Sequence, residues 1–267
     1  MDVVPAPGPV VDRLRAAGCV FAEDEAALLV AAAADDGDLA ALVARRVDGE
    51  PLEQLLGWAA FDGLRIALAP GVFVPRVRSE FLAERAAAAA RPGAVVLDLC
   101  CGSGALGAAV TARVPGIELH AADLDPAAVA CALVNLPGAA VHEGDLFDAL
   151  PAALRGRVDV LVSNVPYVPT SAIALMPPEA RDHEPRLALD GGPDGLAVAR
   201  RVLAGAPDWL APGGTVLFET SEAQVPAALA AVTAAGLTPA VHTDDERGAT
   251  VIAGHQRTRL ISTSGSR

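Results

Sequence analysis

The first part of the chain has apolar residues at helical spacing, up to about residue 48. One segment, EDEAALLVAAAADDGD, begins with acidic residues and ends at a glycine, Gly37. The next, LAALVARRVDG, ends in the same way at Gly49, with arginines in its last turn. This pattern predicts a small helical region at the start of the chain.

A short connecting segment follows the helical region. Pro51 suits the first turn of a short helix that ends at Gly57. The sequence FDGLRIALA then predicts a hairpin or extended pair around Asp62-Gly63, because this dipeptide favours a two-residue turn. Helical spacing returns in SEFLAERAAAAA.

From Ala94 onwards, apolar runs of strand length alternate with helical segments. The predicted strands are AVVLDL, IELHAADLD, AAVHEG, VDVLVSN, TVLFET, LTPAVHTDD and GATVIAG. Such alternation predicts a parallel, doubly wound sheet. The last two strands have no helix between them and predict an antiparallel pair at the edge. A long polar loop is expected between VDVLVSN and about Gly191.

Composition narrows the classes of function. The 267 residues are 52% apolar, enough for a sizeable core, and the net charge of −13 disfavours binding to a phosphate backbone. The four cysteines lack metal-ligand spacing, so we expect reduced thiols, no metal and a cytoplasmic location. We find no signal peptide and no segment with the length and purity of a membrane span.

A glycine-rich loop follows the first predicted strand of the sheet. Gly102-x-Gly104-x-x-Gly107 also matches a dinucleotide fingerprint. Asp98, ahead of the glycines, instead favours S-adenosylmethionine, because a carboxylate attracts its cationic amino-acid part and repels a pyrophosphate. Asp123, at the end of the next strand, is placed to bind ribose hydroxyls. The alternatives are a loop-capping role for Asp98 and a helix N-terminal role for Asp123.

The segment Asn164-Val165-Pro166-Tyr167 contains the only tyrosine of the chain. A planar amide or amine nitrogen becomes a better nucleophile when hydrogen-bond acceptors orient its N–H groups. The Asn164 side-chain oxygen and the Val165 carbonyl can accept those bonds, while Pro166 stiffens the turn. Tyr167 offers an aromatic face to the sulfonium methyl, worth about 0.5–2 kcal/mol. The alternative is a turn with an incidental tyrosine.

These motifs resemble the HemK-type protein-(glutamine N5) methyltransferases, which modify release factors and a ribosomal protein. The resemblance runs from about residue 45 to 254 and is carried by RRVDGEPLEQLLGWAAFDGLRI, GVFVPRVRSE, VLDLCCGSGA, AADLDPAAV, EGDLFDAL, VDVLVSNVPY, HEPRLALDGGPDGL and LAPGGTVLFE. It implies a class I S-adenosylmethionine-dependent methyltransferase. That is an α/β fold with a doubly wound seven-stranded sheet, its last strand antiparallel, and a small N-terminal helical domain with a connecting hairpin.

The resemblance also implies domains and site residues. Residues 1–74 would dock the substrate, 75–256 would form the catalytic domain, and 257–267 would be a loose tail. The implied cofactor-binding residues are Asp98, Cys100, Cys101, Gly102, Ser103, Gly104, Asp123, Asp145, Leu146 and Asn164. The acceptor glutamine amide would be bound at Asn164, Val165, Pro166 and Tyr167, which are also the implied catalytic residues.

Three departures from the family pattern concern the substrate. The usual Asn-Pro-Pro-Tyr is Asn-Val-Pro-Tyr here, which should preserve the chemistry because that position contributes a backbone carbonyl. The usual Pro-Arg-Pro-x-Thr-Glu is PRVRSE, where Arg76 and Arg78 are candidate contacts to an acidic or backbone group of the substrate; the alternative is two solvated arginines. The N-terminal helical domain is shorter, by roughly one helix, than that of the release-factor enzymes of the family. In the loop before Gly191, Glu184 matches the family pattern and would cap or orient the site; its alternative is a surface acid.

Three functions remain open from the sequence. The first is methylation of a glutamine side chain in a release factor, a ribosomal protein or another protein. The second is methylation of adenine N6 or of a small-molecule amine, since planar amino groups suit the same four residues. The third is a catalytically idle protein that binds cofactor and a partner. We expect a monomer.

Overall fold

The computed structural model describes residues 7–257 and begins with a small helical bundle. Its helices are α1 (Pro7–Ala16), α2 (Ala22–Ala32), α3 (Asp36–Val47) and α4 (Leu52–Leu56). Leu14, Leu29 and Val43 lie in a hydrophobic core of its own. The predicted helix end at Gly37 is wrong. The Asp35 carboxylate accepts a hydrogen bond from the Asp38 N–H at 2.8 Å, which starts α3 before the glycine.

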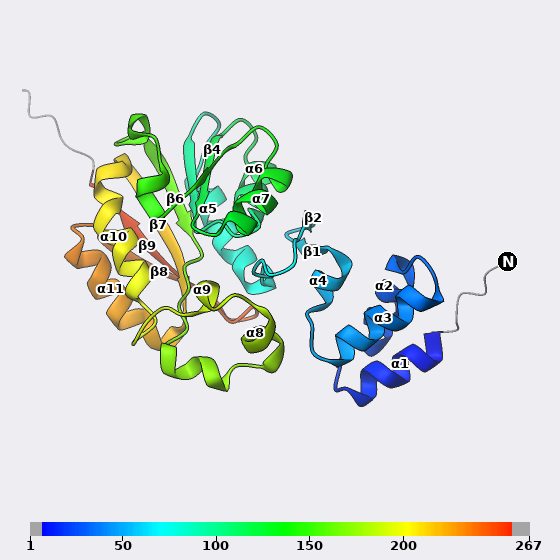
Figure 1. Ribbon diagram of the computed structural model, residues 1–267. Helices are drawn as coiled ribbons and strands as arrows, with labels where there is room; N and C mark the ends of the chain where they lie inside the picture. The colour runs from blue at the N-terminus through cyan, green and yellow to red at the C-terminus, as the bar shows by residue number, and fades with distance from the viewer. Residues whose placement is uncertain (1–6, 258–267) are drawn as a thin grey trace, which may run out of the picture.

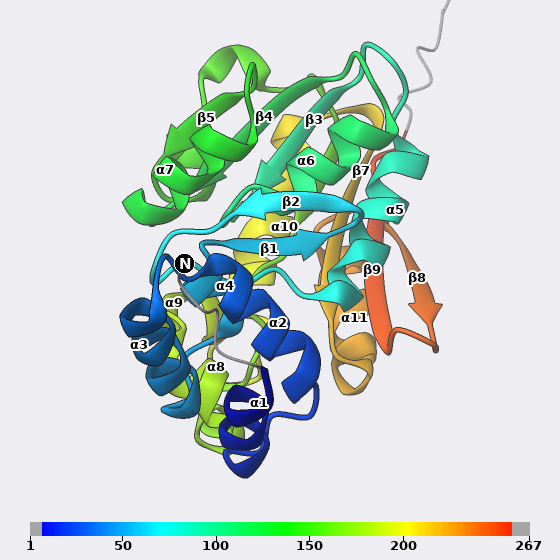
Figure 2. The same ribbon diagram turned by 90° about the vertical axis from the view of Figure 1, so that its right-hand side faces the viewer.

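The predicted hairpin is confirmed. Strands β1 (Trp58–Phe61) and β2 (Leu64–Ala67) pair antiparallel, and the turn residues Asp62 and Gly63 have φ angles of 52° and 74°. Two such angles characterise the type I′ turn that the dipeptide predicts. The hairpin lies between the helical bundle and the large sheet (Figure 2). The segment after it packs Leu68 and Val72 against Cys131.

The large sheet has seven strands, as predicted. They are β3 (Val95–Leu99), β4 (Glu118–Asp123), β5 (Ala140–Glu143), β6 (Val158–Ser163), β7 (Leu210–Thr220), β8 (Thr238–Asp244) and β9 (Ala249–His255). Their order is β5-β4-β3-β6-β7-β9-β8, with β9 antiparallel to both neighbours and the other pairs parallel. The predicted antiparallel pair at the edge is confirmed: β8 is the edge strand, and β9 lies between it and β7.

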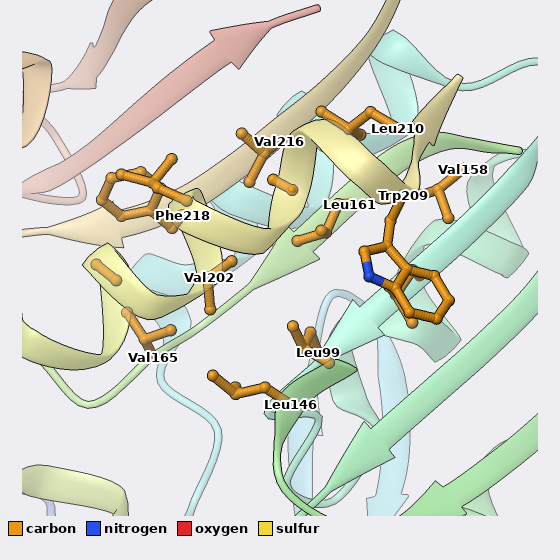
Figure 3. Packing of buried hydrophobic residues seen from close by; sticks show 14 of the residues in the cluster. Leu99, Leu146, Val158, Leu161, Val165, Val202, Trp209, Leu210, Val216 and Phe218 are labelled. Carbon is orange, nitrogen blue, oxygen red and sulfur yellow. The ribbon is translucent and has the colours of Figure 1, made fainter. Parts of the chain in front are cut away.

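Helices cover both faces of the sheet (Figure 1). One face carries α5 (Glu80–Ala89), α6 (Ala105–Arg113) and α7 (Pro126–Asn135), and the other carries α10 (Ala197–Trp209) and α11 (Val225–Ala234). From α10, Val202 and Trp209 pack over Leu161 of β6 and Phe218 of β7 (Figure 3). Burial of each such side chain contributes about 1.5–3 kcal/mol. The two apolar layers hold the strand ends that form the site.

The expected polar loop after β6 contains short helices. They are η4 (Thr170–Leu175), α8 (Pro178–His183) and α9 (Arg186–Leu189). The remaining short helices are η1 (Val77–Ser79), η2 (Leu146–Ala149), η3 (Ala152–Leu154) and η5 (Glu222–Gln224). The Val168 N–H donates to the Leu189 carbonyl at 3.0 Å, and Gly191 N–H donates to the Val168 carbonyl at 2.9 Å. These bonds fasten both ends of the loop to each other.

Three further sequence expectations concern the C-terminal tail, membrane-spanning helices and metal sites. The expected tail, residues 257–267, lies outside the described residues from position 258 onwards. Within residues 7–257, no helix combines the length and apolar character needed to cross a membrane. In the same range, no cluster of three or more His, Cys, Asp or Glu side chains is arranged to hold a metal.

Gly195 supports the turn that holds Tyr167. Its φ angle is +77°, and an added Cβ would lie 2.2 Å from both the Tyr167 carbonyl oxygen and the Gln224 Nε2. The Gln224 side chain in turn donates from Nε2 to the Tyr167 carbonyl at 2.9 Å. Only glycine satisfies both the backbone angle and this close approach.

We therefore predict that Gly195→Ala lowers the free energy of unfolding by about 2–5 kcal/mol, the sum of backbone strain and overpacking. Gly236→Ala is the matched control, because Gly236 has a φ angle of +80° and nothing lies within 4 Å of its Cβ position. The control should lose only the strain, about 1–2 kcal/mol. Urea unfolding measures both, and equal losses would contradict the packing argument.

Candidate active site

A cavity of about 220 Å³ lies at the carboxyl ends of the strands, beside the reversal of strand order at β3 and β6. Ligands of open α/β sheets bind at such a point. Most of the predicted site residues line it: Arg76, Cys100, Cys101, Gly102, Ser103, Asp123, Asp145, Leu146, Asn164, Val165, Pro166 and Tyr167. Three predicted residues, Asp98, Gly104 and Glu184, do not line it. The structure therefore assembles one site from segments far apart in the sequence.

The glycine loop turns sharply between β3 and α6. Gly104 has a φ angle of +80° and begins α6, and a Cβ there would lie 2.9 Å from Leu136 Cδ1. This explains why the loop supports the cavity without reaching it at that residue. Cys100 has a φ angle of +59°, which glycine adopts readily but which is uncommon for a residue with a side chain. Burial raises the pKa of its thiol to about 12, so it stays protonated.

Asp123 connects the glycine loop to the end of β4. Its Oδ2 accepts from the Gly102 N–H at 2.8 Å and its Oδ1 from the Asp125 N–H at 2.9 Å. Burial raises its pKa, and these two bonds work in the opposite direction. Asp125, whose carboxylate accepts from the Ala127 N–H at 2.9 Å, is the residue that caps α7. Each Asp123 oxygen keeps a second lone pair for ligand hydroxyls.

Asp98 is buried behind the glycine loop, with 0% of the residue exposed. Its Oδ2 accepts from the Gly107 N–H at 2.9 Å, and its Oδ1 has no hydrogen-bond partner among the described residues. Asp98 thus caps the loop through the Gly107 N–H, and its expected contact with a ligand stays a prediction. Burial raises the pKa of the carboxyl to about 7.

Asp145 and Leu146 form another wall of the cavity after β5. Arg201 donates to the Asp145 carboxylate at 2.7 Å, which holds the start of η2 against α10. Leu146 has a φ angle of +50° and is almost fully buried, so its apolar side chain is fixed at the cavity. An apolar wall next to Asp123 suits the flat base of a nucleoside ligand.

Asn164 follows β6 directly and presents an unusual amide. Its Nδ2 donates to the Ser79 Oγ at 3.2 Å, while its Oδ1 is buried and has no partner among the described residues. A buried acceptor without a donor costs about 1–3 kcal/mol unless a ligand supplies one. The Val165 side chain points into the core with Leu196 and Val202, so valine fills this position with a packing role.

Tyr167 is held by Glu219 and Arg78. Its hydroxyl donates to Glu219 Oε1 at 2.7 Å and accepts from Arg78 Nη2 at 2.5 Å. Burial raises the pKa of the phenol, and the adjacent Glu219 raises it further. The hydroxyl is therefore a hydrogen-bonding group here and stays protonated. The sequence predicted Arg78 only as a candidate substrate contact and gave Glu219 no role.

Arg76 and Glu184 pair with each other. Arg76 Nη2 donates to Glu184 Oε2 at 2.5 Å, and Glu184 Oε1 accepts from the Val74 N–H at 3.2 Å. The Glu184 side chain is 0% exposed, which rules out a surface acid. Burial raises its pKa, and the Arg76 charge opposes that shift. The pair ties the loop after β6 to the segment before α5, and only Arg76 reaches the cavity.

The residues present fit S-adenosylmethionine. Asp123 offers unused lone pairs beside the glycine loop, which suits the two ribose hydroxyls of a nucleoside. Leu106 and Leu146 add apolar surface to the same cavity. Asn164, whose buried Oδ1 has no partner among the described residues, lines the same cavity after the end of β6. One cavity thus has both groups that suit a nucleoside and a residue whose hydrogen-bond acceptor lacks a donor.

The raised pKa of Asp98 predicts a pH-dependent stability. Between about pH 4 and pH 7 the folded carboxyl keeps a proton that the unfolded carboxyl has lost, so stability falls as pH rises through this window. Asp98→Asn has no proton to lose. Urea unfolding at about pH 5 and about pH 8 should therefore show the variant gaining on the wild type at the higher pH. A constant difference would contradict the assignment.

Comparisons with known proteins identify the fold and the family. The methyltransferase small domain family matches residues 63–176.

Three solved structures share the fold at low sequence identity. A methyltransferase from Pyrococcus furiosus gives a TM-score of 0.56 at 18% identity, covering 73% of this chain and 90% of that one. A ribosomal protein L11 methylase from Lactobacillus delbrueckii gives 0.52 at 16%, covering 72% and 85%. A 16S rRNA N2 G1207 methyltransferase from T. thermophilus, in complex with AdoMet and guanosine, gives 0.54 at 22%, covering 75% and 50%. All three support the class I methyltransferase fold.

Sequence relatives are closer. The release factor glutamine methyltransferase of Geobacter sulfurreducens is 37% identical over 211 residues, which cover 78% of this chain and 73% of that protein. The protein of the same name from Bradyrhizobium diazoefficiens is 34% identical over 250 residues, covering 84% of each chain. With these shares of both lengths aligned, the chain belongs to the release factor glutamine methyltransferase family.

Proposed function

We propose that this protein transfers the methyl group of S-adenosylmethionine to the side-chain amide nitrogen of a glutamine in a release factor. The buried Asn164 Oδ1, an acceptor without a donor on the cavity wall, carries the proposal. A primary amide brings the N–H group that this oxygen lacks. The names of the relatives support a release factor as the protein that carries the glutamine.

We assign the cofactor to the half of the cavity formed by β3 and β4. Asp123 would accept hydrogen bonds from the ribose hydroxyls, and the loop from Cys100 to Ser103 would lie against the amino-acid part. Leu146 would cover the base. Asp98 and Gly104 would act through the loop, the first by binding the Gly107 N–H and the second by allowing its turn. When bound, S-adenosylmethionine supplies an electrophilic methyl group on a sulfonium.

We assign the acceptor glutamine to the half formed by the segment after β6. Asn164 Oδ1 and the Val165 carbonyl would each accept one N–H of the amide, which turns the nitrogen lone pair away from them. Pro166 has no N–H to compete for these acceptors. Holding the nitrogen in line with the methyl group contributes up to about 7–11 kcal/mol in well-oriented systems. The reaction joins nitrogen to the methyl carbon, breaks the sulfonium bond and releases one amide proton.

The other predicted contacts take positioning roles in this proposal. Tyr167 would present its ring to the cationic methyl group, because its hydroxyl is occupied by Glu219 and Arg78. Arg76, held by Glu184, would form the wall where the substrate enters. Residues 7–74 would dock the release factor, and residues 75–256 would carry out the reaction. We propose a monomer that works in the cytoplasm, which the four unpaired thiols suit.

Substitutions at the acceptor turn separate the proposed roles. We predict that Asn164→Ala raises the barrier by about 3 kcal/mol, by analogy with other preorganised hydrogen-bonding groups. Tyr167→Phe keeps the ring and should lose clearly less, whereas Tyr167→Ala should approach the loss at Asn164. Single-turnover methyl transfer measures the three rates. A loss in Tyr167→Phe as large as that in Asn164→Ala would show that the hydroxyl takes part in the chemistry.

The site of methylation tests the proposed substrate. We expect incubation with a recombinant bacterial release factor and radiolabelled S-adenosylmethionine to label the factor, and tandem mass spectrometry to place the methyl group on a glutamine side-chain nitrogen. Asn164→Ala should abolish most of the label. A methyl group on arginine, on a terminal amine or on added adenine-containing nucleic acid would overturn the assignment to a glutamine amide.

A further inference from the structure

Glu219 is a buried carboxylate with a full set of donors. It lies near the end of β7 and is 1% exposed. Arg78 Nε donates to its Oε1 at 2.9 Å, and the Tyr167 hydroxyl donates to the same oxygen at 2.7 Å. The Ser79 hydroxyl donates to its Oε2 at 2.6 Å. Glu219 does not line the cavity of the candidate active site.

The bond from Ser79 to Glu219 decides which way the Asn164 amide points. A serine hydroxyl has one proton, and Ser79 gives it to Glu219. Towards Asn164 the Ser79 oxygen can therefore only accept. Asn164 must then present its Nδ2 to Ser79, as the structure shows at 3.2 Å, and its Oδ1 is left on the other side.

We propose that Glu219 is a positioning residue for methyl transfer, acting through Ser79 to turn the Asn164 carbonyl oxygen towards the acceptor amide. The inference rests on the proposed function, because it concerns how that acceptor is bound. A carboxylate accepts only, so the relay of donors from Asn164 through Ser79 to Glu219 runs in one direction. The Arg78 guanidinium pairs with the same carboxylate, with Nε 2.9 Å from Oε1.

An uncharged side chain at position 219 would allow the relay to reverse. The amide of Glu219→Gln can donate to the Ser79 oxygen, which frees the serine proton to be given to Asn164. Asn164 would then turn its Oδ1 to Ser79 and its NH₂ to the substrate. The NH₂ group of Asn164 would then face the NH₂ group of the substrate glutamine. The glutamine amide would lose its hydrogen bond to Asn164 and, with it, its orientation.

Kinetics of Glu219→Gln test this relay. We expect the single-turnover rate of methyl transfer into a recombinant bacterial release factor to fall by about 10- to 100-fold, the range for a misplaced reacting group. The affinity for S-adenosylhomocysteine, measured by calorimetry, should not change, because Asp123 and the glycine loop are untouched. Glu84→Gln is the matched control: Glu84 also pairs with arginines, Arg113 and Arg247, on the outside of α5, and its loss should leave the rate unchanged.

A double-mutant cycle with Asn164→Ala shows whether Glu219 acts through Asn164. In the Asn164→Ala background, Glu219→Gln should lower the rate of methyl transfer much less than it does in the wild type. The remaining loss of rate should not exceed that of Tyr167→Phe, because Glu219 also holds the Tyr167 hydroxyl. Ser79→Ala should slow the reaction like Glu219→Gln. Ser79→Thr should restore the rate, since threonine keeps the hydroxyl that forms both bonds. A role in folding alone predicts no such dependence on Asn164.

Each outcome bears on one of the two proposals. If Asn164→Ala slows the reaction but the cycle is additive, or if Glu219→Gln keeps the wild-type rate, the relay is wrong and the methylation of glutamine stands. If Ser79→Thr is as slow as Ser79→Ala, the relay is also wrong. If the wild type labels no release factor, the proposed function itself fails. Should Glu219→Gln lose its affinity for S-adenosylhomocysteine through misfolding, the Ser79 pair and its cycle with Asn164→Ala decide the relay alone.

Discussion

The charge of Glu219 has to be compensated inside the protein, and the acceptor half of the site is built around that requirement. A buried carboxylate that loses a partner typically costs about 3–5 kcal/mol. Arg78, Ser79 and Tyr167 supply the partners here, from η1 and from the turn after β6. The segments before α5, after β6 and at the end of β7 are therefore fixed relative to each other by one carboxylate. The groups proposed to hold the acceptor amide are among those it fixes.

The two halves of the cavity depend on different kinds of contact. The cofactor half is formed locally: the loop after β3 binds Asp123 at the end of the neighbouring strand. The acceptor half joins Glu219 to Ser79 and Tyr167, which are 140 and 52 residues away in the sequence. The parallel pairing of β6 with β7 brings Tyr167 close, and the packing of α5 against β7 brings Ser79 close. This division explains why cofactor affinity is expected to survive changes in Glu219 or Asn164. It also explains how a family can keep its cofactor while its substrates differ.

Much of the fold was predictable, because apolar runs of strand length alternate clearly with segments that have helical spacing. The hairpin turn at Asp62-Gly63 was predictable for the same local reason. Errors arose where a capping side chain outweighed a glycine, as at Asp35 and Gly37. The antiparallel edge pair was predictable because no helix separates β8 from β9, but which of the two lies beside β7 was not, since nothing in their own sequences specifies their neighbours.

The candidate site was predictable in part. Asp123 and Asn164 were predictable because each belongs to a short motif whose residues are neighbours both in sequence and in space. The role of Glu219 was not, because a glutamate at a strand end has no local sign of burial or of its partners. For Asp98 the sequence left a ligand contact and a loop-capping role open. The bond to the Gly107 N–H shows the capping role, while the ligand contact stays a prediction, because the full burial of Asp98 comes from tertiary packing.

In our proposal the relay from Glu219 turns the Asn164 carbonyl oxygen towards the acceptor amide. A crystal structure with S-adenosylhomocysteine and a glutamine-containing peptide would show this arrangement. We expect the glutamine amide nitrogen within about 2.7–3.2 Å of both Asn164 Oδ1 and the Val165 carbonyl oxygen, with Asn164 Nδ2 still on Ser79. A peptide bound with its glutamine away from Asn164, or with Nδ2 of Asn164 towards the substrate, would contradict it.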